Sequence, residues 1–149
     1  MPTISPRYDP AGRKQFVNLL VGIDIQPIEE VESSLRTFGS RYRRLLFTDR
    51  ELEICGDNST TSSRLAARFA AKEAVLKILD IQDVVPSWRS IEVGGDSDCR
   101  PEIILYDVAA ELAHAQGIRD VFVSLSRGGD VAVATGVASA WSQSEGVSP

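Results

Sequence analysis

The sequence predicts one α+β domain in which an antiparallel sheet packs with a long central helix. Residues 64–79 are rich in Ala, Leu, Lys, Arg and Glu and contain neither Gly nor Pro, which favours a helix. Residues 16–25 form a nearly continuous apolar run, which is typical of a buried strand. A helical first half followed by a meander of strands predicts this fold class.

Two further helices are expected between the first strand and the central helix. Pro27 opens the first of them, with apolar residues at helical spacing, and Gly39 ends it. The second covers residues 41–54 and restarts at Thr48, which has Glu51 three residues later and so predicts a capping box. The hydroxyls of residues 60–63 are candidates for the N-cap of the central helix.

Short strands and one helix are expected after the central helix. Residues 91–93 and 102–105 are predicted to form a hairpin, and residues 106–116 a helix. Residues 121–126 and 131–137 are predicted to pair around a Gly-Gly turn. These elements complete the sheet.

The length of 149 residues suits a single domain without an internal linker. We expect this domain to cover residues 16–141. Residues 1–15 then form a polar N-terminal extension, and residues 142–149 a loose C-terminal tail. The extension has no apolar segment of the kind found in secretory signals.

Composition argues against several classes of protein. A net charge of −5 argues against a general nucleic-acid binder, and no apolar run reaches the length of a membrane span. Cys55 and Cys99 have no partner at metal-ligand spacing, as expected for idle thiols in a reducing cytoplasm. The only histidine, His114, is expected at the surface, so triad catalysis is unsupported.

Asp24 and Glu73 are the candidates for chemistry that remain. Asp24 ends the first strand, and Glu73 lies on the central helix among the cations Arg68, Lys72 and Lys77. Two carboxylates with phosphate ligands suit Mg²⁺, and this set fits transfer from a pyrophosphate. The alternative is that Asp24 caps the next helix while Glu73 and Lys77 form an ordinary i,i+4 ion pair. The residues alone leave both open.

Four motifs, in order along residues 16–137, resemble those of holo-acyl-carrier-protein synthases. They are Val21-Gly22-Ile23-Asp24, Phe47-Thr48-x-x-Glu51, Arg64-x-Ala66-Ala67-Arg68-Phe69-Ala70-Ala71-Lys72-Glu73-Ala74-x-x-Lys77 and Val123-Ser124-Leu125-Ser126. The central-helix motif is long and specific.

This resemblance implies the 4′-phosphopantetheinyl transferase fold, in its short homotrimeric and cytoplasmic form. It implies transfer of the phosphopantetheine arm of coenzyme A to a serine of an acyl carrier protein. Asp24 and Glu73 are expected to bind Mg²⁺, and Lys77 to steady the phosphates. Glu73, acting through a water, is expected to help deprotonate the carrier serine.

The resemblance also implies two groups of binding residues. The expected coenzyme A contacts are Arg68, Lys72, Arg100, Pro101, Ser126 and Arg127. The expected carrier-docking residues are Arg36, Arg41 and Arg44.

The sequence departs from the family pattern at three places. Arg127 replaces a usual histidine, Glu30 replaces a usual docking arginine, and Cys99 replaces the glycine of a Gly-Lys-Pro turn. Glu30 suggests a dedicated carrier of a polyketide or other secondary-metabolite pathway. The alternatives are a repurposed family member that binds coenzyme A or a carrier without transfer, or acts on carrier-bound substrates, and a likeness of fold alone.

Overall fold

The computed structural model describes residues 16–81, 83–95 and 100–142 of the chain. The predicted extension, most of the predicted tail and Cys99 lie outside these residues. The elements in chain order are β1 (Phe16–Pro27), α1 (Ile28–Phe38), α2 (Ser40–Leu46), α3 (Asp49–Cys55), α4 (Thr61–Ile78), the 3-10 helix η1 (Trp88–Ser90), β2 (Ile91–Gly94), β3 (Glu102–Leu105), α5 (Asp107–Ala115), β4 (Ile118–Gly128) and β5 (Val131–Ser142).

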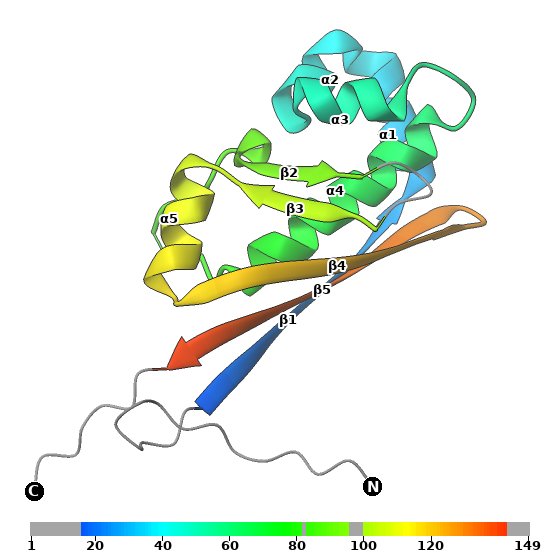
Figure 1. Ribbon diagram of the computed structural model, residues 1–149. Helices are drawn as coiled ribbons and strands as arrows, with labels where there is room; N and C mark the ends of the chain where they lie inside the picture. The colour runs from blue at the N-terminus through cyan, green and yellow to red at the C-terminus, as the bar shows by residue number, and fades with distance from the viewer. Residues whose placement is uncertain (1–15, 82, 96–99, 143–149) are drawn as a thin grey trace, which may run out of the picture.

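The fold is α+β with antiparallel strands, as predicted, but the strands form two sheets and not the single sheet expected (Figure 1). The larger sheet has the strand order β1-β5-β4, and the smaller one is the β2–β3 hairpin. Helix α4 lies between them, since its alanines pack against both Val93 of β2 and Ala134 of β5. Helices α1–α3 gather at one end of α4, and α5 covers the other end.

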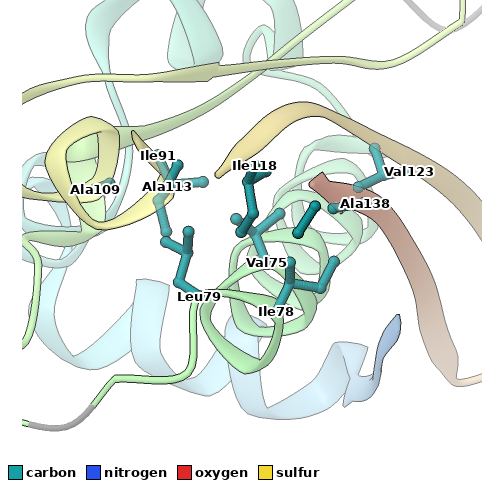
Figure 2. Close-up of a cluster of buried hydrophobic side chains, with 10 residues drawn as sticks. Val75, Ile78, Leu79, Ile91, Ala109, Ala113, Ile118, Val123 and Ala138 are labelled. Carbon is teal, nitrogen blue, oxygen red and sulfur yellow. The ribbon is translucent and has the colours of Figure 1, made fainter. Parts of the chain in front are cut away.

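The core is centred on α4. Figure 2 shows Val75 and Ile78 of α4, and Leu79 directly after it, packed against Ile118 and against residues of α5 and the larger sheet. Strand β5 turns a row of small residues toward the helix, and this lets the two elements approach closely. The residues in this row are Ala132, Ala134, Gly136, Ala138 and Ala140.

Gly22 makes the closest approach between α4 and the sheet possible. A Cβ atom added at Gly22 would lie 2.0 Å from the carbonyl oxygen of Ala74. Its partner across the sheet, Gly136, is less constrained, because a Cβ there would lie 2.8 Å from Cδ1 of Ile78, the end of a side chain that can move. The backbone of β1 therefore rests directly on α4, one residue from Glu73.

The predicted capping box is present at the start of α3. Thr48 Oγ1 accepts a hydrogen bond from the Glu51 backbone N–H at 3.2 Å, and Glu51 Oε2 accepts one from the Thr48 N–H at 2.7 Å. The N-cap of α4 falls within the predicted residues 60–63, but the predicted capping by a hydroxyl is wrong. Thr60 occupies that position but makes no side-chain capping bond; its hydroxyl donates to Asn58 Oδ1 at 2.7 Å.

Strand β1 is buried on one face only, which corrects the prediction of a fully buried strand. Its alternate aliphatic side chains are exposed, by 69% at Leu19, 64% at Val21 and 61% at Ile25. Phe122 of β4 and Val137 of β5 are exposed as well. We call this surface the outer sheet face. Within the described residues, no helix is long and apolar enough to cross a membrane.

Candidate active site

Asp24, Glu73 and Lys77 come together where β1 crosses α4. Lys77 Nζ donates to Asp24 Oδ1 at 2.9 Å and to the backbone oxygen of Ile23 at 2.6 Å. Asp24 shares the helix-facing side of β1 with Gly22, so the close glycine contact brings its carboxylate to α4. The simpler interpretation of Asp24 as a helix cap is wrong, because no side chain caps α1.

The carboxylates of Asp24 and Glu73 lie close enough for their charges to interact. Partial burial raises the pKa of Glu73 most, the negative charge of Asp24 raises it further, and Lys77 opposes both. Two carboxylates sharing a site favour proton uptake unless a cation neutralises them.

This donor set fits Mg²⁺. The ion prefers oxygen ligands and commonly takes one or two carboxylates together with substrate phosphates and water. Among the described residues no group of three or more His, Cys, Asp or Glu side chains could enclose a metal. A cation held by Asp24 and Glu73 would therefore keep positions open for other oxygen ligands.

A cavity of about 340 Å³ lies beside α4, between the end of α3, the end of β2 and strand β4. Of the predicted coenzyme A contacts, four line it: Arg68, Arg100, Pro101 and Arg127. Arg64, which opens the central-helix motif but was not predicted to contact coenzyme A, also lines it. Its position one helical turn before Arg68 was the available signal, because residues four apart share a helix face.

The arginines of the cavity are held by neighbouring oxygens. Arg68 is only 7% exposed and donates from Nη2 to the Gly95 carbonyl at 2.9 Å. Arg127 Nη1 donates to Ser63 Oγ at 3.2 Å, across from β4 to α4. Ser126 is exposed and is not among the residues that line the cavity, whereas Ser124, two residues earlier on the same strand, lines it.

Lys72 does not reach the cavity, which corrects its prediction as a phosphate contact. Its side chain is fully buried, and Nζ donates to Leu46 O at 2.8 Å, Trp88 O at 2.9 Å and Glu51 Oε2 at 2.8 Å. Burial lowers the pKa of Lys72, and the Glu51 carboxylate opposes that shift. All three ammonium protons are occupied, so Lys72 has a structural role.

The predicted docking arginines are exposed on α1 and α2. Arg36 Nη1 lies 3.9 Å from Glu32 Oε2, Arg44 Nη2 donates to Ser40 Oγ at 3.1 Å, and Arg41 is exposed. His114 is exposed on α5, as expected.

Glu30 lies at the other end of α1. Its Oε2 accepts a hydrogen bond from Nε2 of the buried Gln26 at 3.1 Å. Gln26 follows Asp24 by two residues on the same face of β1, so the Glu30 carboxylate is held close to the candidate active site.

Comparison with known proteins connects this site to a family. Residues 20–135, from β1 to β5, match the model of the 4′-phosphopantetheinyl transferase superfamily. The holo-acyl-carrier-protein synthase of Herpetosiphon aurantiacus is 35% identical over 123 residues, which are 78% of this chain and 94% of that protein. The synthase of Moorella thermoacetica is 41% identical over 111 residues, 72% of this chain and 84% of that protein.

Solved structures agree with these relatives. The holo-acyl-carrier-protein synthase of Neisseria meningitidis superposes with a TM-score of 0.71 at 29% identity, covering 80% of this chain and 96% of that one. The Helicobacter pylori synthase in complex with coenzyme A gives a TM-score of 0.69 at 26% identity, covering 80% and 99%.

Proposed function

The chain belongs to the 4′-phosphopantetheinyl transferase superfamily and is an enzyme of the holo-acyl-carrier-protein synthase type; from this premise we propose that its reaction depends on Mg²⁺ held by Asp24 and Glu73. Coenzyme A is the donor and an acyl carrier protein the acceptor. A bond forms between the carrier serine oxygen and the phosphorus of the pantetheine arm. The bond from that phosphorus to the bridging pyrophosphate oxygen breaks, and adenosine 3′,5′-bisphosphate leaves.

The observation that carries the proposal is the meeting of Asp24, Glu73 and Lys77 at one crossing of β1 and α4. When bound, Mg²⁺ would neutralise the charge that develops on the transferred phosphoryl group. Lys77 already contacts Asp24 and can also donate to a phosphate oxygen, which supports a positioning role.

Glu73 is the proposed base for the serine proton, acting through a water. Its pKa is raised, first by burial and then by Asp24. That shift belongs to the site without its cation, and a bound Mg²⁺ would lower the pKa of Glu73 again, so the proposed role as base rests on the position of Glu73 at the crossing of β1 and α4.

The proposed nucleotide site is the cavity beside α4. Arg68, Arg100 and Arg127 offer guanidinium donors to phosphate oxygens, and Pro101 shapes the wall. Arg68 lies five residues before Glu73, about 7.5 Å along the helix axis. The cavity and the carboxylates can therefore hold different phosphates of one extended ligand.

We propose that the protein acts as a homotrimer assembled through the outer sheet face. An exposed set of aliphatic side chains on β1, together with Phe122 and Val137, supports an interface between copies of the chain. Removing these apolar side chains from water lowers the free energy of the assembly relative to separate chains.

The acceptor is proposed to be a dedicated carrier of a polyketide or other secondary-metabolite pathway. Arg36, Arg41 and Arg44 are the proposed cationic docking residues, and Glu30 disfavours a strongly acidic partner near Asp24. Comparing transfer rates on several apo carriers tests this, and equal rates on all of them would count against it.

Residues 16–141 form the transferase domain in this proposal, with residues 1–15 and 142–149 outside it. The cytoplasm is the proposed compartment. The free and buried thiol of Cys55 is compatible with reducing conditions.

The metal requirement has a direct test. We expect apo carrier proteins to gain the phosphopantetheine mass when incubated with the enzyme, coenzyme A and Mg²⁺. Removal of Mg²⁺ with a chelator should stop the gain, and excess Mg²⁺ should restore it. Full transfer in the presence of the chelator would contradict the proposed role of the two carboxylates.

A further inference from the structure

Glu30, in the first turn of α1, carries a negative charge that no cation of the described chain balances. Its side chain is exposed, and among the described residues it forms no ion pair. Acids in the first turn favour a helix, but Glu29 occupies the same turn and has the same effect. Helix stability alone therefore does not account for the position of Glu30.

The carboxylate of Glu30 is held in place from below, unlike that of an ordinary surface glutamate. Gln26 is only 8% exposed, and its Nε2 donates to Glu30 Oε2 at 3.1 Å and to the Pro27 carbonyl at 3.2 Å. These two bonds use both amide protons of Gln26, so the amide group has a fixed orientation. One oxygen of Glu30 is thereby anchored, and the other is left for an external donor.

Tyr42 of α2 shows on which side of α1 this charge lies. Burial raises the pKa of Tyr42 most, a hydrogen bond with Ser34 lowers it, and the negative charge of Glu30 raises it again. Ser34 follows Glu30 by one helical turn and shares its face of α1. The Glu30 carboxylate therefore lies between the end of β1 and α2.

This position is close to the proposed chemistry. Gln26 follows Asp24 by two strand residues, a distance of about 7 Å on the same face of β1. The acceptor serine has to reach a phosphorus held beside Asp24 and Glu73. Because consecutive Cα atoms are about 3.8 Å apart, the carrier residues that flank this serine must pass close to Glu30.

The charges at this end of the site leave Glu30 uncompensated. A bound Mg²⁺ would balance the carboxylates of Asp24 and Glu73. Lys77 is already held by Asp24 and by the Ile23 carbonyl. An acidic carrier side chain would be repelled both by Glu30 and by the donor pyrophosphate, whereas a cationic one would be attracted by both.

We propose that Glu30 is a specificity-determining residue, which selects carriers that have a lysine or arginine within four residues of the acceptor serine. This inference rests on the proposed function, since it concerns the acceptor of that reaction. The anchored carboxylate does more than disfavour an acidic partner. Its fixed place beside Asp24 specifies where on the carrier the cation must lie.

The test uses one apo carrier protein that the wild type modifies. Each position within four residues of its serine is made Lys, Gln or Glu in turn, and the rate of mass gain is measured with wild type, Glu30→Arg and the control Glu29→Arg. At one or more positions we expect the wild type to prefer the Lys carrier over the Glu carrier about tenfold at low salt. Glu30→Arg should reverse this preference, and Glu29→Arg should keep it.

A binding measurement separates recognition from catalysis. Fluorescence anisotropy of the labelled carriers, without coenzyme A or Mg²⁺, should give the same order of affinities. The preference should shrink toward unity at 1 M salt, where the screening length is about 3 Å. A preference that persists at 1 M salt would contradict recognition through the charge of Glu30.

A neutral variant keeps the test decisive if Glu30→Arg does not fold. Glu30→Gln should abolish the preference without reversing it. A wild type that transfers equally to the Lys and Glu carriers, or a folded Glu30 variant with the wild-type preference, overturns the inference and leaves the proposed function intact. A wild type that modifies no carrier at all overturns the proposed function itself.

Discussion

At the scale of single residues, Lys72 shows how one position can look functional and prove structural. Its place next to Glu73 and the family resemblance both suggested a phosphate contact. The structure instead places its ammonium among three oxygens from α2, α3 and η1. A sequence pattern identifies an unusual cation on an apolar face, but the acceptors are 16 to 26 residues away in the chain, so the pattern cannot identify them.

We expect Lys72→Met to destabilise the protein by about 3–5 kcal/mol. The change leaves the Glu51 carboxylate fully buried without its counter-ion. Urea unfolding measures the loss. Adding Glu51→Gln should recover part of it, because the unpaired charge is then removed. Equal stability of Lys72→Met and the wild type would contradict the structural role.

At the scale of the elements, most of the secondary structure was predictable, but the contact that builds the site was not. Local signals located the capping box of Thr48 and Glu51, the helices and the hairpin. The approach of Gly22 to Ala74 joins elements about fifty residues apart, and no local pattern encodes it. The contact between Lys77 and Asp24 is equally non-local: the sequence suggested that the two residues share one site, but not that they touch.

Two glycine substitutions test this contact as a matched pair. Gly22→Ala should cost about 3 kcal/mol or more, since the new Cβ would collide with the backbone of α4. Gly128→Ala should change stability by less than about 0.5 kcal/mol, because nothing lies within 4 Å of its added Cβ. Thermal unfolding of both variants checks the pair, and similar losses would contradict the proposed packing.

At the scale of the whole molecule, the main error of the sequence-based prediction concerns the outer sheet face, which was expected to be buried and is exposed. A continuous apolar run suggested burial on both faces of β1. The described chain covers only the face that meets α4, because only the alternate residues of the strand point that way. The run is consistent with burial of the second face by other copies of the chain.

We expect Leu19→Glu to convert the proposed trimer into monomers. Leu19 is the most exposed aliphatic residue of β1, at 69%. Burying an unpaired carboxylate at this position in an apolar interface would be strongly unfavourable. Light scattering after gel filtration gives the mass. Leu45→Glu on α2, where the leucine is 64% exposed, serves as the control and should remain trimeric. A monomeric wild type at micromolar concentration would contradict the assembly.

The central claim is that this protein transfers phosphopantetheine with chemistry at Asp24 and Glu73. The most direct measurement is the intact mass of apo carrier proteins after incubation with coenzyme A, Mg²⁺ and either wild type, Glu73→Gln or the surface control Glu111→Gln on α5. We predict the added mass with the wild type and the control, and at least a hundredfold slower gain with Glu73→Gln. Equal gain with Glu73→Gln, or no gain on any carrier with the wild type although coenzyme A binds, would contradict the account.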